Sequence, residues 1–299
     1  MENFVITNSS GVFSTLIGFF SWLSVCEENN IKLHFHTTNK TGIYDEKYLV
    51  GNLVSSKDLP ENFLEKNFYL KFFEESEILN EKYPEEYLFT HLYPSDINEI
   101  KIPYCLSKYS GKGFYKEQYK DPDILNDIRS LYNKSWSKFK LNDSFYKKIE
   151  SEENILSNKT LCAMVRTSLH YEGYGHRPQQ MLESIISDVK LKMDDYDSVL
   201  ITTQVQPFVD EFVKVFGDKC IVPERPKRLS HDIDWIGVSQ TMNHEDYLEE
   251  IEYCLMDVIL SSKCNHIIGS SSNMFLGALS MNPSVSFSLF SDLLQFNGL

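Results

Sequence analysis

Short apolar runs alternate with amphipathic stretches along much of the chain, and this alternation is clearest in the second half. Continuous apolar runs predict buried strands, and the stretches of helical spacing between them predict helices. The predicted strands are Thr160–Arg166, Ser198–Thr203, Lys219–Val222, His266–Gly269 and Val285–Phe287. The predicted helices are Pro178–Lys192, Pro207–Phe216, His244–Ser262 and Asn273–Ser280. This repeated alternation predicts an α/β fold with a doubly wound parallel sheet.

The first residues of the chain show the same alternation of predicted strand and helix. Phe4–Thr7 is a predicted strand, a helical stretch runs over Phe13–Glu28, and Ile31–His36 is a second predicted strand. The small-residue turn that ends at Gly11 lies directly before the helix. Backbone N–H groups at a helix N-terminus bind anions or hydroxyl groups, so Gly11 is a candidate binding residue.

The pattern weakens in the middle of the chain. Between residues 51 and 113 we expect only short helices and loops. From residue 121 to about residue 148, apolar residues recur at helical spacing, and this predicts one connecting helix. The economical architecture is two Rossmann-like domains facing a cleft, with residues 1–145 in the first and residues 146–299 in the second.

Composition narrows the range of partners. The chain has 299 residues, 42% hydrophobic and 24% charged, as in ordinary globular proteins. With 29 Lys and Arg against 43 Asp and Glu, the net charge is −14. This balance argues against broad binding of nucleic acid or of an anionic membrane surface, although it permits a local phosphate site.

The cysteines and the longest apolar run indicate in which cellular compartment the protein is expected. The six cysteines are scattered and form no Cys-x-x-Cys pair, so we expect reduced thiols in a cytoplasmic protein and no thiolate metal site. The longest apolar stretch, Val12–Val25, is shorter than the roughly 20 residues that span a bilayer. We therefore expect no membrane insertion.

Polar residues follow three of the predicted strands in the second half, where an open α/β sheet binds its ligands. Arg166 ends the first strand, and its planar fork of donors suits phosphate oxygens. A structural ion pair with a neighbouring carboxylate is an equal alternative. Thr202 and its neighbours end the second strand, where they would bond a base or ribose, or, as we favour, cap the next helix.

The third strand end carries a row of small polar residues, Ser270, Ser271, Ser272 and Asn273, directly before a helix. Hydroxyl groups and free N–H groups at a helix N-terminus form a cradle for a diphosphate. The alternative is a tight turn with an ordinary N-cap.

Asp257 lies among apolar residues in the helix before the last of these strands, so it is predicted to be buried and to need hydrogen-bond donors. A guanine edge supplies two donors. A backbone amide or a lysine would serve equally well in a structural role.

Three other patterns favour ordinary structural roles. The Asp-x-Asp in Asp194–Asp197 precedes a predicted strand and is a solvated turn, not a metal–nucleotide motif. His34 and His36 share one face of a strand, but the sequence shows no third metal ligand. The basic segment Pro223–Arg228 is predicted to be a solvated loop, or a rim that attracts an anionic donor.

Together these segments resemble the GT-B fucosyltransferases that use GDP-fucose: the α1,6-, nodulation and protein O-fucosyltransferases. The family's His-x-Arg at a strand end corresponds to Met164–Arg166. Its Asp, Leu-Ser run, strand and Ser-Ser turn correspond to Asp257–Ser262, the next strand and Gly269–Asn273. The resemblance covers about residues 121–283 and the opening strand, loop and helix.

The resemblance implies specific roles. Arg166 would bind the GDP diphosphate and stabilise the leaving group, the serine turn would cradle the phosphates, and Asp257 would read the guanine edge. Glu172 would be the catalytic base, with His170 as the second choice. Met164 departs from the family, because methionine cannot make the hydrogen bond that histidine makes to the nucleotide.

The resemblance further implies an inverting, metal-independent glycosyltransferase without a cofactor, whose partners are GDP-fucose and a glycan or other hydroxyl acceptor. Residues 1–145 would form the acceptor side, and residues 146–299 would bind the nucleotide sugar. Two alternatives stay open: the same fold with another nucleotide sugar, and a non-catalytic module that binds glycan or nucleotide. A sugar epimerase is disfavoured, because the carboxylate pair and histidine it needs are not evident.

Overall fold

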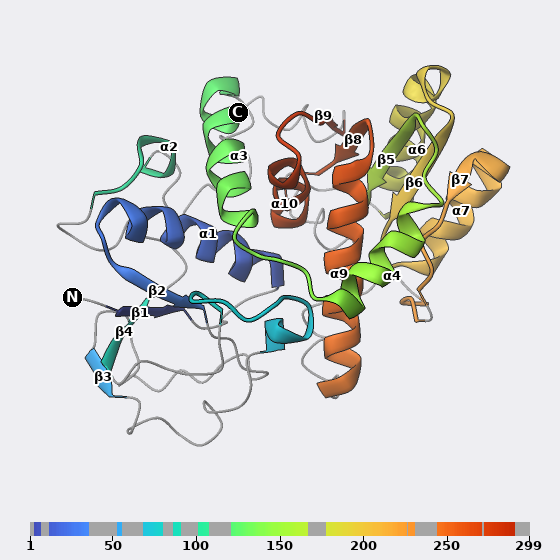
Figure 1. Ribbon diagram of the computed structural model, residues 1–299. Coiled ribbons are helices and arrows are strands. Elements are labelled where there is room, and N and C mark those ends of the chain that lie inside the picture. The colour runs from blue at the N-terminus through green and yellow to red at the C-terminus, as the bar shows by residue number, and fades with distance from the viewer. Residues whose placement is uncertain are drawn as a thin grey trace. The chain divides into compact units, whose positions relative to one another are not determined.

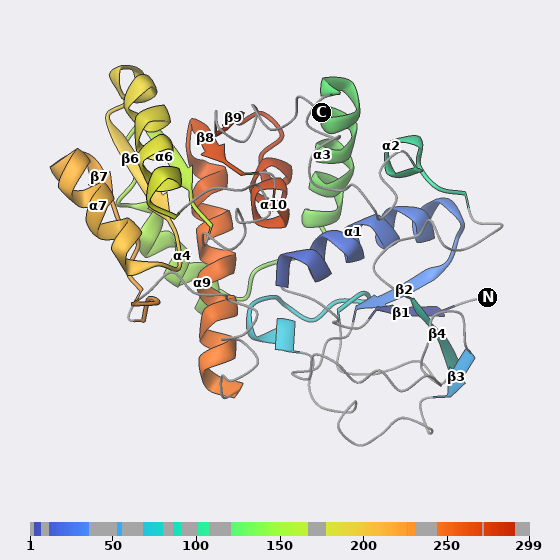
Figure 2. The same cartoon turned by 180° about the vertical axis from the view of Figure 1, so that it is seen from behind.

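The computed structural model describes residues 3–6, 12–35, 53–55, 68–79, 86–90, 101–107, 121–166, 178–225, 227–230, 244–270 and 272–290. The chain divides into two compact units, Met1–Tyr146 and Lys147–Leu299. Figures 1 and 2 show the elements of both units from opposite sides.

The first unit contains a four-stranded sheet in the order β2-β1-β4-β3. Its strands are β1 (Asn3–Ile6), β2 (Lys32–Phe35), β3 (Leu53–Ser55) and β4 (Glu86–Thr90). β1 pairs in parallel with β2 and β4, and β3 pairs antiparallel to β4. Strands β3 and β4 lie where the sequence predicted only short helices and loops, so that prediction is wrong for these segments.

Helix α1 (Val12–Glu28) joins β1 to β2 and accounts for the longest apolar run of the chain. Leu16 and Trp22 are fully buried in it. The buried hydroxyls of Ser21 and Ser24 each donate to the backbone carbonyl four residues earlier, so these polar groups are satisfied inside the core. Among the described residues, no helix is both long and apolar enough to cross a membrane.

Two helices replace the single connecting helix predicted from residue 121 onwards. They are α3 (Pro122–Trp136) and α4 (Asp143–Glu153). The Asp121 carboxylate caps α3 by accepting from the N–H groups of residues 123 and 124, at 3.1 and 3.2 Å. Between the helices, Leu141 pairs with Phe73 in an isolated antiparallel bridge. This tertiary contact interrupts an apolar periodicity that by itself indicates one continuous helix.

Aromatic contacts join α1 to α3. The rings of Phe20 and Trp136 meet edge to face, with centroids 4.7 Å apart, and the hydroxyls of Ser21 and Tyr132 lie 2.7 Å apart. The shorter helical elements of this unit are η4 (Phe68–Lys71) and α2 (Tyr104–Ser107). The aromatic residues of α1 and α3 thus build this part of the core.

The second unit is built on a five-stranded parallel sheet in the order β7-β6-β5-β8-β9. Its strands are β5 (Thr160–Met164), β6 (Ser198–Thr202), β7 (Cys220–Ile221), β8 (His266–Gly269) and β9 (Ser286–Leu289). Its helical elements are α6 (Pro178–Lys192), η7 (Met193–Asp195), α7 (Gln206–Phe216), η8 (Gly217–Lys219), α9 (His244–Lys263) and α10 (Asn273–Met281). The predicted α/β fold is confirmed.

Alternate residues of the central strand β5 serve different layers. Leu161 and Ala163, together with Val165 directly after the strand, belong to an apolar core that also contains buried residues of α6 and α7. Cys162 points to the opposite face, where its thiol lies 3.2 Å from the Ser261 hydroxyl of α9. Helices α9 and α10, orange to red in Figure 1, pack against each other.

The strand order places a topological switch point between β5 and β8. From β5 the chain proceeds outward to β6 and then β7, whereas after α9 it returns to the other side of β5 to form β8 and then β9. Ligands of open α/β sheets bind where the carboxyl ends of strands meet at such a point. The switch point therefore marks where a site is to be sought in this unit.

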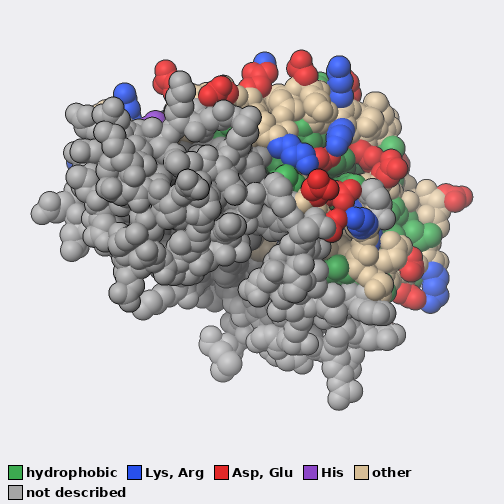
Figure 3. Space-filling model, turned by 90° about the horizontal axis from the view of Figure 1, so that it is seen from below, with side chains coloured by type: hydrophobic (Ala, Val, Ile, Leu, Met, Phe, Trp, Pro, Cys, Tyr) green, Lys and Arg blue, Asp and Glu red, His purple; other side chains and the backbone are tan. Residues whose placement is uncertain are grey.

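All six cysteines are free thiols, as predicted. Charged side chains of both signs lie next to one another on the described part of the face in Figure 3. Among the described ion pairs, Lys227 Nζ lies 2.8 Å from Asp246 Oδ1, with the lysine side chain exposed. Exposed pairs of this kind contribute little to stability.

Candidate functional site

Three strand ends come together at the switch point. In the sheet register, Met164 at the end of β5 stands between Thr202 of β6 and Gly269 of β8. The residues that follow these strands therefore lie at one edge, with Arg166 two positions beyond Met164 and Ser270 one position beyond Gly269.

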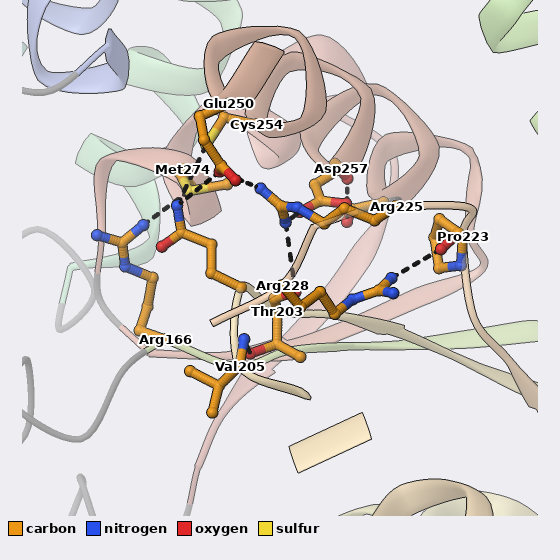
Figure 4. A network of polar contacts seen from close by, with 12 residues as sticks. Arg166, Thr203, Val205, Pro223, Arg225, Arg228, Glu250, Cys254, Asp257 and Met274 are labelled. Atoms are coloured by element: carbon orange, nitrogen blue, oxygen red, sulfur yellow. Dashed lines mark hydrogen bonds and ion pairs between the residues drawn. The ribbon is translucent and has the colours of Figure 1, made fainter. Parts of the chain in front are cut away.

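The guanidinium of Arg166 lies at the start of α10. Its Nη1 donates to the Met274 thioether sulfur at 2.8 Å, and Figure 4 shows the Arg166 side chain extended toward Met274. The side chain is half-buried. A helix N-terminus carries partial positive charge, so a cation beside it is unfavourable unless an anion lies between them. The arrangement therefore favours an anion at this corner.

The turn before α10 provides further donors. Ser272 is the N-cap of α10, and its hydroxyl accepts from the Phe275 N–H at 3.2 Å. Ser270 is 2% exposed, and its buried hydroxyl has no hydrogen-bond partner among the described residues. A buried polar group without a partner is uncommon, and a bound anion would satisfy it. Asn273, the first residue of α10, is also buried.

Gly269 allows α10 to approach β8 closely. A Cβ atom at this position would lie 2.5 Å from Cδ2 of Phe275, a distance that real Cβ contacts do not show. The Phe275 ring thus packs directly on the Gly269 backbone. Because residue 269 has no side chain, the first turn of α10 can lie close to the strand ends.

The residues at the end of β6 differ in what their side chains contact. Thr203 accepts from the N–H of Val205, the N-cap residue of α7, at 3.3 Å, so this hydroxyl serves the turn into the helix. Thr202 is 3% exposed, and its hydroxyl makes no hydrogen bond within the described part of the chain. Gln204 turns toward α9, where its amide nitrogen lies 3.4 Å from a Glu250 carboxylate oxygen.

Asp257 takes part in a buried ion network (Figure 4). Its Oδ2 lies 3.3 Å from Nη1 of Arg225, while Nη2 of Arg225 lies 2.6 Å from Glu250. The same Nη1 donates to the carbonyl of Thr203 at 3.3 Å. The donor that a buried Asp257 was predicted to need is therefore supplied by an arginine of the chain.

Sequence reasoning missed Arg225. It lies in the basic segment predicted to be a solvated loop, yet it is only 8% exposed, so that prediction is wrong for this residue. Glu250 and Asp257 are seven residues apart and share one face of α9, since seven residues make about two helical turns. Two buried carboxylates on one helix face require a cation, and this was the available signal.

Burial raises the pKa of Asp257 to about 6, with Glu250 adding to the rise and Arg225 and Arg228 opposing it. Burial also raises the pKa of the Cys254 thiol, on the same face of α9, to about 12. At neutral pH the network therefore holds an ionised Asp257 beside a neutral thiol.

Other predicted site residues lie outside the described part of the chain. These are Gly11, His170, Glu172 and Ser271. Of the donor-site residues predicted in the second unit, Arg166, Ser270, Ser272 and Asn273 are brought together at the switch point. Thr202 lies at the same sheet edge.

The patterns given structural roles fall elsewhere in the units. Asp194 and Asp195 belong to η7 and lie before β6, at the opposite edge of the sheet from the strand ends described above. His34 lies in β2 of the first unit, and His36 is not described. Within the described ranges, no group of three or more His, Cys, Asp or Glu side chains is arranged to hold a metal ion.

Comparison with solved structures gives a consistent fold. A fucosyltransferase NodZ from Bradyrhizobium matches with a TM-score of 0.53 at 13% identity, over 95% of this chain and 94% of that chain. NodZ α-1,6-fucosyltransferase co-crystallised with GDP matches at 0.54 and 14% identity, over 95% and 93%. The same enzyme soaked with GDP-fucose matches at 0.52 and 14% identity, over 95% and 94%. The likeness confirms a fold of the GT-B fucosyltransferase kind.

Searches by sequence add nothing to this likeness. No protein-family model matches the chain, and no curated protein matches it.

Proposed function

We propose that the chain is an inverting glycosyltransferase that moves a fucosyl group from GDP-fucose to a hydroxyl group of a glycan or similar acceptor. The observation that carries the proposal is the position of Arg166 at the first turn of α10, at the same sheet edge as the buried, unsatisfied hydroxyl of Ser270. The fold resemblance to NodZ, which has been crystallised with GDP and soaked with GDP-fucose, supports the same donor.

The proposed reaction is a direct displacement at the anomeric carbon. The acceptor oxygen forms the new bond to carbon while the bond from that carbon to the diphosphate oxygen breaks, and GDP leaves with the bonding electrons. Charge develops on the diphosphate, where Arg166 and the N–H groups of α10 would stabilise it. In this scheme the chain's own hydrogen-bond donors stabilise the charge that develops on the diphosphate, so the proposal includes no metal or cofactor.

The acceptor hydroxyl must lose a proton as it attacks. We assign Glu172 as the base, with His170 as the second candidate, because both follow Arg166 closely in sequence and their residue types accept protons. The first unit would provide the acceptor side, and Gly11, which directly precedes α1 in the sequence, is proposed to contact the donor.

Recognition of the base is proposed for Asp257. Adjacent N–H groups on a guanine edge suit a carboxylate acceptor, and Asp257 lies in the helix that packs beside α10 at the switch point. The Thr202 hydroxyl is a further candidate donor contact from the neighbouring strand.

A release assay tests the proposal. The chain is incubated with GDP-fucose and an array of glycan acceptors, and both free GDP and fucosylated product are measured. Arg166→Ala should reduce transfer by at least about 100-fold, which is the scale of losing a charged group that stabilises a transition state. The variant leaves Arg225 and Ser272 unchanged, and circular dichroism tests whether the protein is still folded. Near-normal turnover of Arg166→Ala would contradict the assignment.

One observation favours a second candidate, the same chemistry with another nucleotide sugar. Met164 is 1% exposed between Thr202 and Gly269, where the fucosyltransferases have a histidine that contacts the nucleotide. Thermal shift with GDP, UDP and dTDP separates the donors, because only a nucleotide that binds the folded state raises the melting temperature. A shift with UDP or dTDP and none with GDP would favour this second candidate.

A further inference from the structure

Arg225 ties three elements of the second unit together from a fully enclosed position. Its side chain is 2% exposed and reaches from the segment after β7 to the end of β6 and to α9. Nη2 bonds Glu250 at 2.6 Å, while Nη1 is shared between the Asp257 carboxylate and the Thr203 carbonyl, both at 3.3 Å. The guanidinium also lies 5.1 Å from the centre of the Tyr253 ring.

The two carboxylates are held unequally. Glu250 takes the short contact with Nη2, which bonds no other group among the described residues, whereas Asp257 receives a longer contact from Nη1, which it shares with Thr203. A carboxylate can accept several hydrogen bonds, so after its one long contact with Arg225 the Asp257 carboxylate can still accept others. The geometry fixes Asp257 on one side and keeps acceptor capacity for a further donor.

We propose that Arg225 is a positioning residue for nucleobase recognition, which orients the Asp257 carboxylate so that it accepts the adjacent N–H donors of the bound base. This inference rests on the proposed function, since it concerns the base of the nucleotide donor. Arg225 does not itself touch the nucleotide in this arrangement. Its effect on binding passes through Asp257.

The charges around Asp257 support this role. Arg225 and Arg228 face it from the segment after β7, and Glu250 and Cys254 face it from α9. Burial raises the pKa of Asp257, and the two arginines oppose that rise. Without Arg225 the pKa of Asp257 would rise further, and a protonated carboxyl group would no longer give the charge-assisted bonds that read a base.

The test compares GDP with inorganic pyrophosphate, measured by titration calorimetry on the full chain. Pyrophosphate reports on the anion site alone, whereas GDP reports on that site and on the base. Arg225→Gln should weaken GDP binding by about 10-fold, the scale of one hydrogen bond to a charged group, with pyrophosphate affinity within about twofold. Asp257→Asn should show the same selective loss, and the double variant should bind GDP no more weakly than Asp257→Asn.

Glu250→Gln is the matched control. It removes the other ion pair of Arg225 but leaves the Arg225–Asp257 contact, so at neutral pH the ratio of GDP to pyrophosphate affinity should stay at the parent value. The pH profile adds a readout that a merely structural role would not move. In the parent this ratio should fall as the pH drops through about 6; Arg225→Gln should move the fall to higher pH and Glu250→Gln to lower pH.

If Arg225→Gln does not fold, Arg225→Lys is tested instead. Lysine keeps the positive charge but cannot bridge Asp257 and Thr203 as the planar guanidinium does. It should weaken GDP binding by about threefold or more with pyrophosphate unchanged. Equal effects on GDP and pyrophosphate, or losses that add to those of Asp257→Asn, would overturn the inference and leave the proposed function standing. A parent chain that binds neither GDP nor pyrophosphate would overturn both.

Discussion

Gly269→Ala tests how the strand end and α10 are fitted together. The added Cβ would lie 2.5 and 2.8 Å from Cδ2 and Cε2 of Phe275, so the ring or the strand must move. Phe275 is fully buried, and its ring packs edge to face on Phe287 at a centroid distance of 5.9 Å. Forcing extra volume into a packed core costs about 1–3 kcal/mol, and this is the expected loss in the free energy of unfolding.

The displacement should also reach the candidate site. Phe275 donates its N–H to the Ser272 cap, so moving Phe275 shifts the first turn of α10 relative to Arg166. We therefore expect weaker binding of GDP and of pyrophosphate alike, together with the loss of stability. Chemical denaturation followed by circular dichroism measures the stability, and titration calorimetry measures the two affinities.

Phe275→Leu provides the control. On its own it should destabilise by about 1–2 kcal/mol by leaving space in the core. In the double variant, the smaller side chain at position 275 makes room for the methyl group added at position 269, so the combined loss should be clearly less than the sum of the single losses. Additive losses, or a Gly269→Ala protein as stable as the parent, would refute the packing argument.

Two further predictions concern stability away from the candidate site. Asp121→Ala removes the cap of α3 and should cost about 1 kcal/mol in urea denaturation, while Asp121→Asn keeps most of the stability; equal midpoints for the two variants would contradict the capping role. Burial lowers the pKa of His266 to about 4, and its ring bonds Ser286 and Ser288. Because the unfolded chain binds this proton at a higher pH, stability contributed by neutral His266 is lost as the pH falls from about 6.5 toward 4. Asp257, whose pKa burial raises, adds stability over the same pH range, but it does so in both proteins and cancels in the comparison. His266→Gln should therefore flatten the decline relative to the parent, and an unchanged slope would contradict this role of His266.

The α/β alternation of the second unit could be predicted because its central strands are buried on both faces. Strands such as β5 and β6 therefore appear as unbroken apolar runs that need no tertiary information to recognise. The turn before α10 was equally visible, since small polar residues directly precede a helix. The position of Arg166 near that turn follows from the strand order, in which β8 lies next to β5.

Other features depend on contacts between distant residues. The break between α3 and α4 is stabilised by pairing of Leu141 with Phe73, and the local apolar spacing carries no trace of it. Strands β3 and β4 are short and belong to a stretch rich in charged and aromatic residues, where no period stands out. Arg225 meets its carboxylate partners 25 and 32 residues further along the chain, so its burial could be inferred only from their need for a cation.

A crystal structure of the chain with GDP tests the central claim most directly. The account predicts that the diphosphate lies at the switch point between β5 and β8, in contact with the Arg166 guanidinium, the Ser270 hydroxyl and the N–H groups that open α10. A nucleotide bound away from this corner, with Arg166 still donating to Met274 and no anion beside it, would contradict the account.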